Sequence, residues 1–187
     1  MTEKEKNKLG LIYDPNNDLE LIKEREISQT LCMKYNNIGP SDKSKREEIL
    51  KSLLGSIGNN CTMEQPIHFD YGYNSYIGDN FFSNYNFTVL DCAEVHIGNN
   101  VFIGPNVSIY TPLHPLNYKE RNKGLETSKK VVIEDNVWIA GSVTILPGVT
   151  IGANSVIGAG SVVTKDIPSN SLAFGNPCTV KNKIDVE

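Results

Sequence analysis

The sequence predicts a mainly β protein built on a parallel β-helix of hexapeptide repeats, preceded by a helical segment. Three observations predict this fold: an aliphatic residue recurs at every sixth position, a valine often stands two positions before it, and a glycine often follows it. A helical period of 3.6 residues cannot produce such a column, and neither can a β-meander with irregular turns. The column consists of Ile97, Ile103, Ile109, Ile133, Ile139, Ile145, Ile151, Ile157 and Val163.

Each six-residue repeat is expected to supply one short strand and one corner of a triangular coil. Its column residue points inward and stacks on the column residue 18 positions later, in the next coil. Neighbouring coils then pair as parallel strands about 4.8 Å apart, and glycine beside the corner permits a tight turn. We assign residues 56–187 to this β-helix.

Residues 1–55 lack the column and show helical spacing of apolar residues instead. Asp18 is expected to cap a first helix, and the segment 36–40, with its glycine and proline, is expected to interrupt the helical pattern. Ser41 is then expected to cap a second helix, which ends at Gly55. This part of the chain is therefore predicted to be an N-terminal helical segment.

The column has two irregularities. Ile57 and Ile77 look like column residues, but Ile77 lies 20 positions before Ile97 and is out of phase by two, which predicts an irregular corner. Residues 111–132 preserve the phase but lack the repeat, and they contain two prolines and several charges. We expect them to form a loop ejected from the β-helix, and a long polar loop in a regular scaffold is a candidate functional element.

The ejected loop contains His114, which lies between Pro112 and Pro115. The prolines restrict the backbone, so the imidazole is suited to act as a general base near neutral pH; the alternative is an ordinary surface histidine. His96 lies 18 positions earlier, and this spacing allows it to stack one coil below His114. His68 is too distant to complete a three-histidine site, so no metal is expected.

Trp138 immediately precedes the column residue Ile139, so its side chain is expected to point outward. It is either a packing residue at a subunit interface or a wall beside a ligand. No phosphate-binding glycine-lysine loop, dinucleotide fingerprint or nucleophile elbow is present. Four carboxylates are not brought together by their spacing and, taken alone, indicate ordinary surface or turn positions: Asp14, Asp70, Asp91 and Glu126.

The composition excludes several classes of protein. A net charge of −4 gives no sign of the basic face that nucleic-acid binding requires. No apolar run approaches the roughly 18 residues of a membrane span, and the N-terminus lacks the apolar core of a secretion signal. The four cysteines form no CxxC pair, which favours reduced thiols. We therefore expect a cytoplasmic protein with no nucleic-acid or membrane partner.

Several further blocks of sequence are distinctive: FDYGYN at 69–74, NFFSNYN at 80–86, LD at 90–91, IYT at 109–111, the His114-Pro115 pair, NVWI at 136–139, PGVTIG at 147–152 and IGAGSVVTKDIP at 157–168. Together they resemble the hexapeptide-repeat sugar O-acetyltransferases: the maltose, galactoside and nodulation acetyltransferases. The resemblance covers nearly the whole chain and implies a left-handed β-helix, a homotrimer with its sites between subunits, and acetyl-CoA as co-substrate.

The resemblance also implies roles for single residues. His114 takes the position of the general base. The acceptor sugar contacts fall on Asp14, Asp70, Asn84 and Asp91. The acetyl-CoA contacts fall on Trp138, Gly141, Ala159, Thr164 and Lys165.

The chain departs from the family pattern at three places. At the position of Asp70, galactoside relatives have serine and maltose relatives have aspartate. The aspartate of this chain therefore favours the maltose branch. Cys92 stands where galactoside relatives have a second carboxylate. Thr179 and Asn182 replace arginines that hold the phosphates of coenzyme A in some relatives, and the nearby Lys181 and Lys183 are candidate point charges for that role.

The resemblance therefore predicts an enzyme that moves acetyl from acetyl-CoA to a hydroxyl of a sugar such as maltose or glucose. His114 would act as the base in a direct transfer, with a backbone N–H near Gly141 as donor to the oxyanion. Two alternatives stay open: an acetyltransferase for a non-sugar acceptor, such as an antibiotic or an amino acid, and a non-catalytic trimeric scaffold.

Overall fold

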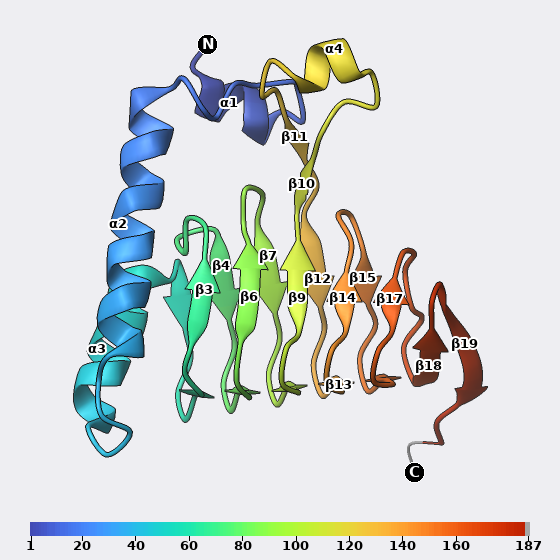
Figure 1. Ribbon diagram of the computed structural model, residues 1–187. Helices are drawn as coiled ribbons and strands as arrows, with labels where there is room; N and C mark the ends of the chain where they lie inside the picture. The colour runs from blue at the N-terminus through green and yellow to red at the C-terminus, as the bar shows by residue number, and fades with distance from the viewer. Residues whose placement is uncertain (186–187) are drawn as a thin grey trace.

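The computed structural model describes residues 1–185 and confirms a mainly β fold, in which helices precede a stack of short parallel strands (Figure 1). The N-terminal helices are α1 (Glu3–Lys8), α2 (Leu19–Asn36) and α3 (Lys43–Leu53). Across the described part of the chain, none of the helices has the length and apolar character that a membrane crossing requires.

Most of the strands form three sheets, which are the three faces of a prism. The first sheet contains β1 (Ser56–Ile57), β4 (Ser75–Ile77), β7 (Val95–Ile97), β12 (Val131–Ile133) and β15 (Thr150–Ile151). The second sheet contains β2 (Thr62–Met63), β5 (Phe82–Ser83), β8 (Phe102–Ile103), β13 (Trp138–Ile139), β16 (Val156–Ile157), β18 (Ser171–Gly175) and β19 (Cys178–Lys183). The third sheet contains β3 (Ile67–Phe69), β6 (Phe87–Leu90), β9 (Ser108–Tyr110), β14 (Thr144–Ile145) and β17 (Val162–Val163).

The predicted aliphatic column is confirmed as the core of the prism. Ile139 pairs in parallel with Ile103 on one side and with Ile157 on the other, so the inward side chains stack coil upon coil. The column residues and the valines two positions before them are almost completely buried. Burial of large aliphatic side chains contributes about 1.5–3 kcal/mol each, so this column is the main source of the stability of the β-helix.

The predicted irregular corner is confirmed, and it always occurs on the same edge of the prism. Ile57 pairs with Ile77, which pairs with Ile97, so the first two coils each contain 20 residues. The extra residues lie where the chain passes from the third sheet to the first, at 70–74 and 91–94. We call this corner, with its three insertions at 70–74, 91–94 and 111–130, the insertion edge.

The third insertion is the ejected loop, which the structure also confirms. It leaves and re-enters the prism through an antiparallel pair, β10 (Pro112–Leu113) and β11 (Thr127–Ser128), and carries the short helix α4 (Tyr118–Arg121). Figure 1 shows this hairpin standing out from the stack of strands, with α1 beside it. The insertion edge is thus where the regular scaffold carries its irregular segments.

Helices α2 and α3 close the N-terminal end of the β-helix. The Tyr35 hydroxyl donates to the carbonyl of Met63 at 2.6 Å, and the Ser28 hydroxyl donates to the carbonyl of Phe69 at 3.0 Å. Arg46 also donates to the Met63 carbonyl. These bonds satisfy backbone groups that an uncovered terminal coil would leave open to pairing with another chain.

One predicted cap is confirmed and another is wrong. The Asp18 carboxylate accepts the Leu21 N–H at 2.9 Å and caps α2, as predicted. Ser41 does not cap α3, because that helix begins one residue later and Asp42 is its N-cap. An aspartate immediately before the first turn also places negative charge at the positive end of the helix dipole, which favours Asp42 in this position.

Asparagines at the corners of the coils form a ladder that can be tested. Asn100 has φ 55°; its amide accepts from Asn80 at 3.0 Å and donates to Asn136 at 3.2 Å. We expect Asn100→Ala to lower the free energy of unfolding by about 1–2 kcal/mol, since alanine resists the left-handed region and breaks the ladder. Asn100→Gly should cost less in a urea titration, because glycine adopts this φ freely. Equal losses in the two variants would contradict a conformational cause.

Candidate functional site

The ejected loop holds His114 in one defined ring orientation. Its Nδ1 lies 3.0 Å from the carbonyl oxygen of Leu125. A carbonyl oxygen only accepts, so Nδ1 carries the hydrogen of the neutral ring and Nε2 keeps the lone pair. The side chain is exposed, and Nε2 lies 3.7 Å from Oε1 of Glu126. The arrangement therefore presents a free basic nitrogen beside a carboxylate.

Glu126 is itself held by Tyr13, a residue of the N-terminal segment. The two residues exchange backbone N–H···O bonds of 3.0 Å in both directions, and the Tyr13 hydroxyl donates to Glu126 Oε2 at 3.0 Å. Burial raises the pKa of Tyr13, so its hydroxyl remains protonated and donates. The prediction that Glu126 is an ordinary surface carboxylate is wrong, because Tyr13 holds it by these three bonds. No local pattern in the sequence indicates a pairing across 113 residues.

Asp70 lies on the insertion edge, close to Glu126 and the ejected loop. Its Oδ2 lies 3.7 Å from the thiol sulfur of Cys92, which is nearly buried. Partial burial of the carboxyl and the negative charge of Asp91 raise the pKa of Asp70 to about 6, and the charge of Arg25 opposes this shift. Glu126 is close enough to add to the same repulsion. The surroundings of Asp70 thus disfavour the charged form of its carboxyl group.

Asp91 has a different position from the one expected for an acceptor contact. Its side chain is 0% exposed, and its carboxylate accepts the Tyr71 N–H at 2.8 Å and the Ser75 hydroxyl at 3.0 Å. These bonds hold the first insertion, where Gly72 adopts φ 73° and a Cβ would collide with Leu53. The expectation that Asp91 touches the sugar is corrected: within the chain its carboxylate is enclosed and shapes the corner.

Asp14 lies in the loop between α1 and α2 rather than in a helix. Its carboxylate accepts hydrogen bonds from the backbone N–H groups of Asn16 and Asn17 at 3.1 Å, and from the Asn17 side chain at 2.8 Å. The Asn17 side chain and these backbone donors lower the pKa of Asp14. Because Asp14 directly follows Tyr13, its backbone lies beside the bonded pair of Tyr13 and Glu126.

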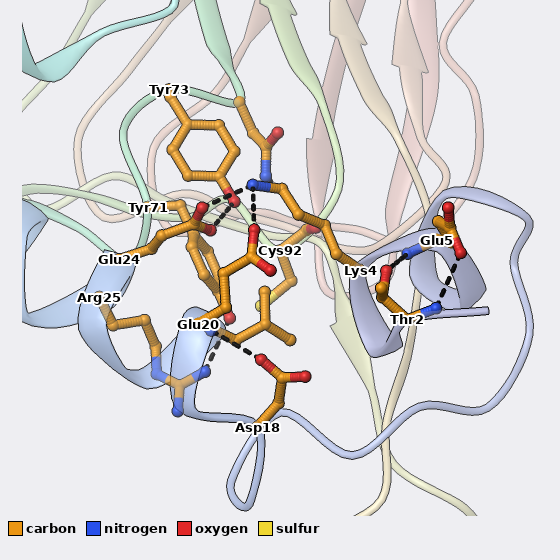
Figure 2. A network of polar contacts seen from close by, with 12 residues as sticks. Thr2, Lys4, Glu5, Asp18, Glu20, Glu24, Arg25, Tyr71, Tyr73 and Cys92 are labelled. Atoms are coloured by element: carbon orange, nitrogen blue, oxygen red, sulfur yellow. Dashed lines mark hydrogen bonds and ion pairs between the residues drawn. The ribbon is translucent and has the colours of Figure 1, made fainter.

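The N-terminal helices are fixed to the insertion edge by polar contacts (Figure 2). Lys4 of α1 forms an ion pair of 2.6 Å with Glu24 of α2, and Glu24 accepts the Tyr73 hydroxyl at 2.6 Å. Arg25 donates to the Tyr71 hydroxyl at 2.7 Å. Since Tyr71 and Tyr73 belong to the first insertion, the helices and the insertion edge form one packed unit.

A second group of predicted residues lies on the outer face of the second sheet. Asn84, Trp138 and Gly141 line one hollow of about 600 Å³ together with Phe82 and Phe102. The Trp138 side chain is 53% exposed, which confirms that it points outward. The hollow has apolar walls and one polar amide.

Gly141, one of the residues that line this hollow, has an unpaired backbone N–H in the described part of the chain. The flanking Ala140 and Ser142 N–H groups donate to the carbonyls of Ile157 and Pro105, respectively, whereas the Gly141 N–H has no acceptor among residues 1–185. A free N–H in such a position is the kind of group that stabilises an oxyanion.

The remaining predicted acetyl-CoA residues are exposed and lie on two edges. Ala159 follows β16 on the same edge as Gly141, whose carbonyl accepts the Gly160 N–H at 3.0 Å. Thr164 and Lys165 follow β17 on the insertion edge, several coils beyond Asp70. The structure therefore does not bring all the predicted residues together within one chain. It gives one half-site around His114 and another around Trp138.

The predicted stacking of His96 below His114 is wrong. His96 pairs with Val132 of the next coil, because the chain leaves the prism at residue 111 before His114 is reached. Its ring instead stacks on Tyr76 with centroids 4.7 Å apart, and its Nε2 lies 2.9 Å from Glu94. Within residues 1–185 no three side chains of metal-binding type are grouped.

Comparison with known proteins gives two matching family models: a maltose acetyltransferase hexapeptide capping motif over residues 8–58 and a bacterial transferase hexapeptide of six repeats over residues 130–165. A putative acetyltransferase of Saccharomyces cerevisiae, YJL218W, is 51% identical over 94% of this chain and 89% of its own length.

Two solved structures are similar over almost the full chain. A maltose O-acetyltransferase from Clostridium difficile 630 has a TM-score of 0.97 and 52% identity, covering 100% of this chain and 99% of its own. A galactoside acetyltransferase in complex with coenzyme A has a TM-score of 0.95 and 42% identity, covering 99% and 92%.

Proposed function

The chain belongs to the hexapeptide-repeat sugar O-acetyltransferases, and from this membership we propose that it moves acetyl from acetyl-CoA to a hydroxyl of a sugar such as maltose or glucose. One observation carries the proposal. His114 has its Nδ1 bonded to a carbonyl oxygen and its Nε2 free beside Glu126, on the edge that also carries Asp70. The coenzyme A complex of the similar galactoside acetyltransferase supports the identity of the co-substrate.

In the proposed reaction His114 Nε2 removes the proton of the acceptor hydroxyl as its oxygen attacks the thioester carbonyl. The tetrahedral intermediate collapses, the carbon–sulfur bond breaks, and the imidazolium returns the proton to the departing thiolate. The Glu126 carboxylate, 3.7 Å away, stabilises the imidazolium by charge. Direct transfer needs no acyl-enzyme, and burial raises the pKa of Cys92, which makes this thiol a poor nucleophile.

We assign the acyl side of the site to the second group of residues. The free Gly141 N–H is the proposed oxyanion donor, and the apolar hollow with Trp138 would accommodate the thioester end of the co-substrate. Ala159, Thr164 and Lys165 are proposed to contact the rest of acetyl-CoA. At the phosphate end, Lys181 lies over the Phe174 ring at 5.3 Å.

We further propose a homotrimer whose sites lie between subunits. The His114 group is on the insertion edge, whereas Asn84, Trp138 and Gly141 line a hollow on the second sheet. Since these two half-sites occupy different parts of one prism, a second copy that faces its hollow toward the insertion edge would complete the site. The acceptor would then be held by Asp14 and Asp70 through charge-assisted hydrogen bonds, with Asn84 supplied across the interface.

The proposal is tested by following acetyl-CoA-dependent thiol release with a panel of acceptors. Maltose, glucose and a galactoside represent the sugars, and chloramphenicol and an amino acid represent the alternatives. We expect release only in the presence of sugars, together with an acetylated sugar detected by mass spectrometry. Release with a non-sugar alone would overturn the sugar assignment, and a flat result with every acceptor would favour a non-catalytic scaffold.

A further inference from the structure

Tyr13 and Glu126 form a short bridge between the N-terminal segment and the ejected loop. Three hydrogen bonds of 3.0 Å join this single pair: two between the backbones, and one from the Tyr13 hydroxyl to Glu126 Oε2. The bridge is the one point where the N-terminal loop pairs in β fashion with the ejected loop. It therefore fixes both the backbone and the side chain of Glu126.

The Tyr13 ring is itself immobilised. It is 1% exposed and packs in a small buried cluster with Leu21, Tyr71 and Cys92. Its hydroxyl occupies only Oε2 of Glu126, so the other carboxylate oxygen stays directed at His114 Nε2, 3.7 Å away. A carboxylate fixed by one oxygen and free at the other is the arrangement that orients charge toward a developing cation.

A second contact anchors the base of the ejected loop to the same N-terminal segment. The Asn7 side chain donates to the Cys92 carbonyl at 2.7 Å and accepts from the Ser128 hydroxyl of β11. Glu3 accepts the Asp14 N–H at 2.6 Å. The segment 1–17 thus binds the second and third insertions at once, as its place beside the hairpin in Figure 1 indicates.

We propose that Tyr13 is a positioning residue of the acetyl transfer. It holds Glu126 so that the carboxylate stabilises the His114 imidazolium as the proton is taken up. This inference rests on the proposed function. It gives the N-terminal segment a part in the reaction as well as in covering the end of the β-helix.

The test compares Tyr13→Phe with Tyr73→Phe. Each variant keeps the aromatic ring and removes one hydroxyl that donates to a carboxylate. Tyr13 donates to Glu126 and Tyr73 donates to Glu24. Tyr73→Phe is the control, because neither Tyr73 nor Glu24 contacts His114. We expect Tyr13→Phe to lower kcat about tenfold to 150-fold, the effect of losing one hydrogen bond to a charged group. The KM for acetyl-CoA should stay within about twofold, and the acidic limb of the kcat profile should move to lower pH. Tyr73→Phe should leave kcat, the KM for acetyl-CoA and the acidic limb of the kcat profile unchanged.

Glu126→Gln provides a second variant that keeps the backbone bridge and removes the charge. We expect it to move the acidic limb in the same direction, and we expect the Tyr13→Phe, Glu126→Gln double variant to be no worse than Glu126→Gln alone. Additive losses, or a Tyr13→Phe enzyme indistinguishable from Tyr73→Phe, would overturn the inference.

A readout independent of turnover separates this inference from the proposed function. Crystal structures of the wild-type protein and of the three variants provide this readout. We expect the Glu126 carboxylate to leave its position 3.7 Å from His114 Nε2 in Tyr13→Phe and to keep it in Tyr73→Phe. A Glu126 carboxylate that stays beside His114 in Tyr13→Phe contradicts the positioning role, whereas a wild-type protein that acetylates no sugar contradicts the proposed function instead.

Discussion

Replacing His114 with alanine is expected to lower kcat of acetyl transfer by roughly 10²–10⁴-fold. The imidazole offers the free Nε2 on the ejected loop, held by the Leu125 carbonyl and facing Glu126. Without it, the sugar hydroxyl must attack while still protonated or lose its proton to water. The Glu126 carboxylate, 3.7 Å from the missing ring, would be left without the cation that it stabilises.

Binding of coenzyme A should survive this substitution, because His114 is not one of its proposed contacts. Trp138 and Gly141 line the hollow on the second sheet, and Thr164 and Lys165 lie on the insertion edge beyond β17. Isothermal titration with coenzyme A checks this, and steady-state rates with the best sugar of the panel give kcat. His96→Ala is the matched control, since His96 is exposed and interacts with Tyr76 and Glu94 on the first sheet. Near-normal turnover by His114→Ala would refute its role as the base.

Replacing Asp70 with asparagine is expected to stabilise the protein at neutral pH by about 2 kcal/mol. Partial burial and the nearby charge of Asp91 raise the pKa of Asp70 to about 6, from an ordinary value of 3.8. When folding raises the pKa of an acid, that group stabilises the fold at pH values below its unfolded pKa. This contribution to the free energy of unfolding is lost as pH rises through the folded pKa. The ionised Asp70 therefore destabilises the fold above about pH 6.

Urea unfolding between pH 4 and 8 tests the sign and the window of this effect. The two proteins should differ little near pH 4, and the advantage of Asp70→Asn should grow between about pH 4 and 6 and then level off. Asp135→Asn is the control, because Asp135 is exposed and its amide analogue can still accept the Asn99 N–H. A stability difference that does not depend on pH would contradict the assignment.

The same substitution should impair the reaction. A charged Asp70 binds sugar hydroxyls more strongly than a neutral amide, so KM for the acceptor should rise about tenfold while KM for acetyl-CoA changes little. In the wild-type enzyme, KM for the acceptor should also rise as pH falls through about 6, and Asp70→Asn should lose this dependence. A gain in stability with a loss of function is the usual signature of a strained site.

Sequence alone determined the scaffold of this protein. The six-residue column places a buried aliphatic side chain on each face of every coil. Because each coil repeats the same environment, a short stretch of sequence is enough to indicate both the period and the buried positions. The outward direction of Trp138, the cap at Asp18 and the ejected loop follow from the same local patterns. The interrupted phase at Ile77 also indicated where the coils become irregular.

Only the tertiary structure decided which irregular segments meet. The pairing of Tyr13 with Glu126 spans 113 residues and has no period, so it depends on how the paired strands place the ejected loop beside the N-terminal segment. The enclosure of Asp91 likewise follows from how the first insertion folds over its carboxylate. Periodic burial is repeated in the sequence and can be read from it, whereas single long-range contacts occur once and leave no pattern.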